Sequence, residues 1–93
     1  MAQRLKDKPL IRNSRDPENA EAHYLVLYND DFNTFDYVIN SLIEVCDHSS
    51  EQAEQCATIT HYKGKCEVKK GLKKDLQPRQ VALIKRNLKA LIE

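Results

Sequence analysis

The sequence has little of what marks several common protein classes. Its 93 residues include no Trp, 2 Gly and 3 Cys. With so few glycines there is no phosphate-binding loop, and Cys46, Cys56 and Cys66 lack the close pairs of a zinc or redox site. No apolar run approaches the about 20 residues that span a bilayer, and the N-terminus lacks the apolar stretch of a secretory signal. We therefore expect a cytoplasmic protein with free thiols that pack in the fold and no membrane partner.

Basic residues are missing from the middle of the chain. Residues 24–62 contain no Lys or Arg, whereas residues 63–93 contain ten basic and three acidic side chains. The acidic side chains of the middle segment are Asp30, Asp31, Asp36, Glu44, Asp47, Glu51 and Glu54. Such a segment is unsuited to nucleic acid and suited to a cation, so we expect no nucleic-acid partner. The lysine-rich last third can serve as a solvated strand edge or dock an acidic partner, and the sequence leaves both open.

Hydrophobic periodicity predicts a single α+β domain over residues 23–93. The expected order is β-α-α-β-α-β, which folds as a three-stranded antiparallel sheet with three helices packed on one face. Residues 1–22 contain Pro9 and Pro17, few apolar residues and mixed charges, so we expect a flexible N-terminal extension. The expected elements are strands at 23–28, 65–70 and 88–93, with helices at 35–46, from Ser49 to Gly64, and from Asp75 to Asn87. A third helix that runs to the end of the chain would also fit residues 88–93.

Capping residues predict where the helices begin and end. Asn33 or Thr34 can cap the first helix, and Ser49 with Gln52 has the spacing of a capping box for the second. Gly64 is available for the left-handed turn that ends the second helix. In the third helix we expect Asp75 to be the cap, Pro78 to lie in the first turn where no donor is lost, and Gly71 to mark the preceding turn.

The densest polar cluster is Asn29, Asp30 and Asp31, between the first strand and the first helix. It can be a turn with a helix cap, or it can receive a cation. His61 comes before the turn at Gly64, and the sequence leaves open whether it is a structural residue, a surface residue or part of a site. Together these side chains can bind an ammonium group or a metal ion.

Enzyme functions find little support in the sequence. No Ser or Cys nucleophile stands in a recognisable motif with a partnered His, and a domain this small rarely forms a deep cleft. A small metal-dependent hydrolase with ligands among His23, Asp30, Asp31 and His61 is one alternative, although the spacing of these residues is unspecific. We expect a binding protein without a metal or cofactor.

Two motifs in register resemble the ClpS family. The first is HYLVLYNDDFNTFDYVINSLIEV, residues 23–45, which has that family's apolar strand, its Asn-Asp-Asp turn, an aromatic residue and a helix rich in Val and Ile. The second is HYKGK, residues 61–65, which is similar to the family's His-Tyr/Thr-x-Gly-Lys/Arg element. The last strand of the family is similar to LKALIE, residues 88–93. The resemblance covers roughly residues 23–93 and makes this segment a ClpS-like adaptor core.

The resemblance implies an adaptor and not an enzyme. ClpS proteins bind free N-termini with a bulky hydrophobic first residue (N-degrons) and deliver these substrates to a Clp AAA+ unfoldase and protease. The implied partners are substrate proteins and the N-terminal domain of a ClpA- or ClpC-type unfoldase, with the adaptor as a monomer. The residues implied to bind the substrate α-amino group are Asn29, Asp31 and His61. The implied pocket for the first side chain consists of Leu27, Asp30, Asn33, Phe35, Val38, Ala57, Thr60 and Leu88.

The sequence also departs from the family pattern. Thr34 replaces a common Pro, Phe35 replaces the usual Met at the pocket entrance, Ala57 replaces a larger residue, and Thr60 replaces Val. Phe35 is expected to narrow the pocket and Ala57 to deepen it. Residues 67–87, the region that helps contact the unfoldase in ClpS proteins, differ most. A factor-docking or ribosome-associated domain, like the C-terminal domain of the ribosomal stalk protein, is the alternative on a similar architecture.

Overall fold

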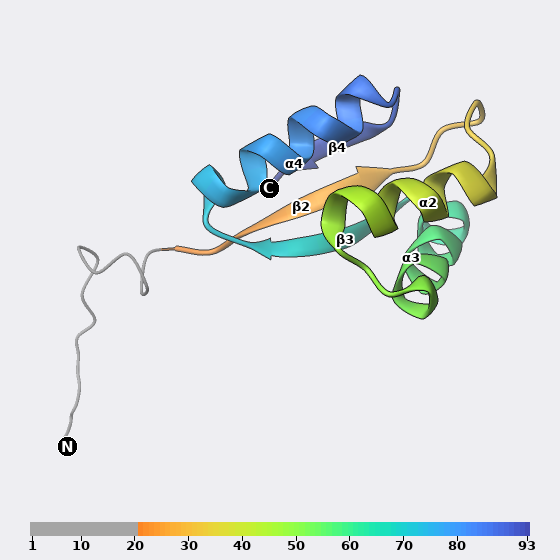
Figure 1. Cartoon of the computed structure of the whole chain (residues 1–93), viewed down its shortest axis with the longest axis horizontal. Coiled ribbons are helices and arrows are strands. Elements are labelled where there is room, and N and C mark those ends of the chain that lie inside the picture. The colour runs from red at the N-terminus through yellow and green to blue at the C-terminus, as the bar shows by residue number, and fades with distance from the viewer. Residues whose placement is uncertain (1–20) are drawn as a thin grey trace, which may run out of the picture.

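Three strands and three helices follow one another in a computed structural model that describes residues 21–93 (Figure 1). The order is β-α-α-β-α-β, so the predicted α+β class and element order are confirmed. The predicted flexible extension, residues 1–22, lies outside the described residues except for its last two. Within residues 21–93, no helix has the length and apolar character needed to cross a membrane. The elements are β2 (His23–Tyr28), α2 (Phe35–Cys46), α3 (Ser50–Lys63), β3 (Lys65–Gly71), α4 (Lys73–Lys85) and β4 (Lys89–Ile92).

The strand that comes first in the sequence lies in the middle of the sheet. The order is β3-β2-β4, and β2 is antiparallel to both neighbours. Leu27 on β2 is in register with Cys66 on β3 and with Ala90 on β4. The turn at residues 29–33, which follows β2, therefore lies at the end of the sheet where β3 and β4 begin.

One face of the sheet carries the core, and the three helices pack on it. Leu25 and Leu27 belong to the buried cluster that includes Leu42 of α2 and Leu76 and Leu83 of α4. In Figure 1, α4 lies along β2 and β4, while α2 and α3 lie together near β3. Burying each of these leucines contributes roughly 1.5–3 kcal/mol relative to exposure, so this face holds the fold together.

The three cysteines are free, as the sequence predicted, and all three are buried. Burial is the main cause that raises the pKa of Cys46 to about 11. Burial, followed by a hydrogen bond with Cys56, raises the pKa of Cys66 to about 12. Because the thiolate is the reactive form, these side chains act as small apolar packing residues at neutral pH.

Helix caps agree with the sequence at α2 and α3. The Tyr37 N–H donates to Thr34 Oγ1 at 3.1 Å, so Thr34, one of the two candidates, caps α2. The Gln52 N–H donates to Ser49 Oγ at 3.1 Å at the start of α3. Gly64 ends α3 with φ of 93°, a left-handed conformation that glycine adopts without strain.

The predicted start of the third helix was wrong. Helix α4 begins at Lys73, because Asp75 N–H and Leu76 N–H both donate to the Leu72 carbonyl and buried Leu76 anchors this turn in the core. Asp75 therefore lies inside the first turn, where its charge suits the helix dipole, and Leu72 takes the N-cap position without a side-chain bond.

Two neighbouring predictions change with this earlier start, and the start of the last strand is corrected as well. Pro78 lies in the second turn of α4, where it removes one backbone hydrogen bond. Gly71 is the last residue of β3 and not a turn. At the other end, Asn87 has φ of 67°, and the last strand is residues 89–92, so that buried Leu88 precedes it.

Candidate functional site

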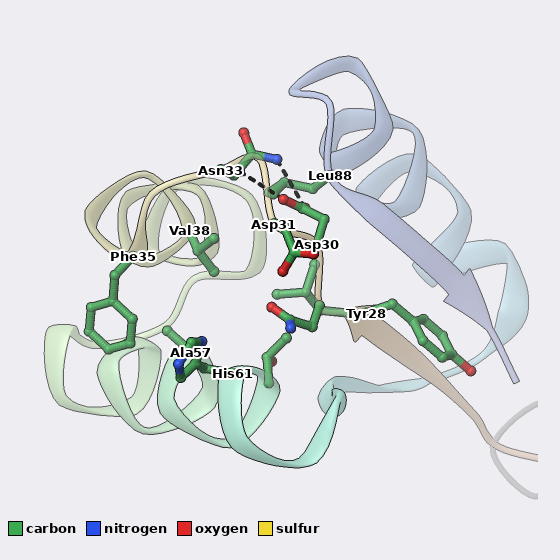
Figure 2. Close-up of a pocket in the computed structure, with 12 residues that line it drawn as sticks. Tyr28, Asp30, Asp31, Asn33, Phe35, Val38, Ala57, His61 and Leu88 are labelled. Atoms are coloured by element: carbon green, nitrogen blue, oxygen red, sulfur yellow. Dashed lines mark hydrogen bonds between the residues drawn. The ribbon is translucent and has the colours of Figure 1, made fainter.

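One pocket gathers every residue that the sequence placed in the candidate site. It lies where the end of β2, the start of α2, the second half of α3 and the start of β4 meet (Figure 2). The predicted residues that line it are Leu27, Asn29, Asp30, Asp31, Asn33, Phe35, Val38, Ala57, Thr60, His61 and Leu88. Their shared position is a finding of the structure, and their roles stay predictions.

Tyr28 is the remaining lining residue, and the sequence did not suggest it. Its ring points away from the pocket, on the open face of the sheet (Figure 2). There it lies near Lys65 and Lys89, whose Nζ atoms are 5.8 and 5.4 Å from the ring centroid. Tyr28 therefore contributes backbone to the pocket, which no side-chain pattern could signal.

The Asp30 carboxylate organises the turn between β2 and α2. Oδ1 accepts from the Phe32 N–H at 2.8 Å and from the Asn33 N–H at 2.7 Å, and Oδ2 accepts from Asn33 Nδ2 at 3.0 Å. Burial acts to raise the pKa of Asp30, but these hydrogen bonds outweigh it and lower the pKa below its ordinary value. The Asp30 carboxylate is therefore bonded to its own turn, which fits the interpretation of the cluster as a turn with a helix cap (Figure 2).

Asn29, Asp31 and His61, called here the unpaired set, behave differently. Within residues 21–93 none of the three side chains makes a hydrogen bond or ion pair with the protein, and all three are exposed. Their backbone is nevertheless held, because the Asn29 N–H donates to the Gly64 carbonyl at 2.9 Å and joins the turn to the end of α3. The unpaired set offers a ligand a carboxylate, an amide oxygen and an imidazole nitrogen.

The deeper part of the pocket is mostly apolar. Leu27, Ala57 and Leu88 are buried, and Val38 is half-buried. Phe35 stands at the margin with 44% of its surface exposed, and its ring extends from the start of α2 toward α3 (Figure 2). Burial of an apolar ligand group against such a wall is favourable by roughly 25 cal/mol per Å².

A second group of contacts, called here the brace, holds Leu88 against the pocket. Asn33 Nδ2 also donates to the Asn87 carbonyl at 2.9 Å, and the Tyr37 hydroxyl donates to the Arg86 carbonyl at 2.9 Å. Arg86 in turn bonds Ser41 Oγ at 3.3 Å and the Glu44 carboxylate. Sequence reasoning missed Tyr37, Arg86 and Asn87 as supports of the site, since nothing local signals contacts more than 40 residues apart.

The chemistry of the site fits a ligand with a positive head and an apolar side. An ammonium group has three donors, and each member of the unpaired set can accept one. Among residues 21–93, no three His, Cys, Asp or Glu side chains form a group that could hold a metal ion. The ligands named for a metal-dependent hydrolase, including His23, are thus not assembled into a metal site.

The chain folds as a small α+β domain with a pocket beside the end of its central strand, and comparison with known proteins places it in a family. Residues 18–90 match the family model described as ATP-dependent Clp protease adaptor protein ClpS. The chain belongs to the ClpS family.

A solved structure, ClpS2 of Agrobacterium tumefaciens bound to L-phenylalaninamide, has a similar fold. The TM-score is 0.71 with 19% sequence identity, covering 77% of this chain and 94% of that one. At this identity the likeness concerns the fold alone. No curated protein matches the sequence.

Proposed function

We propose that this protein is an adaptor that binds free N-termini with a bulky hydrophobic first residue and delivers the substrates to a Clp AAA+ unfoldase. The observation that carries the proposal is the contrast inside one pocket. Three exposed acceptors that bond no other described residue lie at its polar side, and an apolar wall lies beside them. An α-ammonium group with its own first side chain has this same arrangement. The adaptor itself carries out no catalysis and needs no cofactor.

Recognition of the α-amino group rests on the unpaired set. Asp31 supplies the negative charge, and Asn29 Oδ1 and a neutral His61 ring nitrogen accept further N–H bonds. Charge-assisted bonds are worth roughly 1.5–3 kcal/mol each. An acetylated N-terminus loses its charge and most of its donors, so it would leave Asp31 without a partner and bind poorly.

The first side chain occupies the apolar wall in this proposal. Leu27, Val38, Ala57 and Leu88 form the lining, and Phe35 forms the margin. Asp30 and Asn33 shape this region by holding the turn rather than by touching the substrate amine. A small first residue such as Ala would leave the wall unfilled and lose the burial that favours binding.

Membership of the ClpS family supports an unfoldase N-terminal domain of the ClpA or ClpC type as the partner, with a monomeric adaptor. The docking surface in this proposal lies on α4, outside the pocket lining. Helix α4 exposes Val81 and Ile84 together with Lys74 and Lys85, and none of these residues lines the pocket. A partner bound there would leave the pocket open to substrate.

Fluorescence anisotropy with short labelled peptides tests the substrate half of this proposal. Peptides that begin with Phe or Leu should bind when the N-terminus is free, and acetylation should weaken binding on the order of 100-fold, as expected for a lost charge-assisted contact. A peptide that begins with Ala is the control for the apolar wall. Equal binding of the free and acetylated forms would rule out recognition of the α-amino group.

Delivery is tested by degradation of a reporter with an N-terminal Phe, using ClpA with ClpP and, in parallel, ClpC with ClpP. The adaptor should accelerate degradation of the reporter with one of the two unfoldases. It should not change the degradation rate of a reporter with an acetylated Phe. Peptide binding without acceleration by either unfoldase would leave an N-terminus binder and remove the delivery step from the proposal.

A further inference from the structure

Thr60 is a polar residue in the buried part of the pocket lining. It is 4% exposed and lies on the second half of α3, three residues after Ala57. Its hydroxyl oxygen is 2.7 Å from the Cys56 carbonyl oxygen. The proposed recognition of the α-amino group makes no use of Thr60.

The hydrogen bond to Cys56 determines what the Thr60 hydroxyl can do. A carbonyl oxygen has no proton, so Thr60 must donate its single proton to Cys56. The Thr60 oxygen keeps a lone pair and has no second proton to give. Toward a ligand in the pocket, Thr60 can therefore act only as an acceptor.

The surroundings make this acceptor selective. Leu27, Val38 and Leu88 are apolar neighbours in the pocket, and hydrogen bonds gain strength where water is excluded. Ala57 has no side chain beyond Cβ and lies on the same side of α3 as Thr60, which leaves room for a large ring. Phe35 offers an aromatic edge or face to that ring at the margin.

We propose that Thr60 makes the pocket prefer first residues whose aromatic ring carries a hydrogen-bond donor, Trp and Tyr, over Phe and Leu. This inference rests on the proposed function and adds a specificity-determining residue to it. The indole N–H or the phenol O–H donates to Thr60 Oγ1. A Phe or Leu side chain fills the same space and leaves that oxygen unpaired.

Peptide isosteres test this without altering the protein. Free peptides that begin with Trp are compared with those that begin with 3-benzothienylalanine, in which sulfur replaces the indole N–H. Peptides that begin with Tyr are compared with those that begin with Phe. Each donor-bearing peptide should bind about fivefold more tightly than its isostere. This is the change in affinity expected from the net contribution of one neutral hydrogen bond.

The same pairs are then measured in Thr60→Val, which keeps the shape and removes the oxygen. The Trp and Tyr advantages should fall about fivefold, and Phe should bind slightly more tightly because no acceptor is left unpaired. Thr60→Ser, which keeps the oxygen, should retain both advantages and serves if the Val variant does not fold.

Two results would overturn the inference while leaving the proposed function in place. One is equal binding within each isosteric pair by the unaltered protein. The other is an unchanged preference in Thr60→Val. Failure of every free N-terminus to bind is a different result, because it would contradict the proposed function and the inference together.

Discussion

The unpaired set lines the pocket and the brace lies mostly behind it, and although both are polar, their hydrogen bonding differs. Asn29, Asp31 and His61 are exposed and have no protein hydrogen bonds within residues 21–93. The side chains of the brace bond to α2 and to the α4–β4 connection. Polar side chains that hydrogen-bond within the fold fix the positions of the segments they join. Polar side chains without such bonds are available to a ligand.

Asp30 and Asp31 show this contrast in two adjacent residues. Asp30 accepts three hydrogen bonds from its own turn, and Asp31 accepts none from the described residues. The sequence presents two equivalent carboxylates. Their different roles follow from which one faces the backbone of the turn, so substitutions should separate binding from stability.

The largest effect should come from Asp31→Asn. This variant removes the charge that we assign to the α-ammonium, and it should weaken binding of a free Phe peptide on the order of 10- to 100-fold. Asp36→Asn is the matched control, because Asp36 is a nearby exposed acid outside the pocket lining. Similar losses in both variants, measured by anisotropy, would mean that net charge and not the site governs binding.

Acid should weaken binding through the imidazole of the unpaired set. Protonation of His61 turns an acceptor into a donor and places a positive charge beside the ammonium group. Affinity for a free Phe peptide should therefore be lower in acid, on the order of tenfold for the loss of one acceptor.

His61→Gln should flatten this profile, since the amide oxygen stays an acceptor when the solution is acidified. His23→Gln serves as the control, because His23 lies at the far end of β2 and does not line the pocket. A pH dependence that survives His61→Gln would assign the effect to another group.

Asp30→Ala should act mainly on stability. Losing the acceptor of three hydrogen bonds should lower the free energy of unfolding by about 1 kcal/mol, since the turn is partly solvated. The pKa of Asp30 is lowered in the fold, so its contribution is present above the unfolded pKa and is lost as pH falls through the folded pKa.

Urea unfolding across the acid range measures this contribution. Asp30→Asn should keep part of the stability, because its amide oxygen can accept from the turn, but it should lose the pH dependence that belongs to Asp30. An Asp30→Ala variant with full stability and reduced binding would instead place Asp30 with the unpaired set.

The smallest effect should come from Tyr37→Phe in the brace. It removes one exposed hydrogen bond to the Arg86 carbonyl and should cost about 0.5 kcal/mol of unfolding free energy, with a slight loss of peptide affinity as Leu88 loosens. Tyr62→Phe is the control, because Tyr62 is 80% exposed and its hydroxyl bonds no described residue. Equal thermal stability of both variants and the unaltered protein would contradict a stabilising role for the Tyr37 bond in the brace.

Short-range sequence patterns predict much of the fold. The caps at Thr34 and Ser49 and the turn at Gly64 followed from side-chain chemistry within a few residues. The start of α4 did not, because buried Leu76 anchors the first turn and the N-cap is Leu72, three residues before the predicted cap Asp75. Burial of a large side chain in a shared core outweighs a surface cap, and a single segment of sequence does not reveal that burial.

By itself the sequence determined the strands, the helices and the residues that can carry chemistry, because these depend on periodicity and on residue type over short distances. Only the three-dimensional structure shows which polar side chains are hydrogen-bonded within the described residues and which are available to a ligand. It tied Asp30 to its turn, left Asp31 open, committed the Thr60 proton to Cys56 and joined Asn33 to Asn87 across the fold. Such assignments depend on hydrogen-bond geometry between particular atoms. The bonds of Asp30 and Thr60 join atoms within three or four residues, and the fold brings Asn33 and Asn87 together from distant parts of the chain.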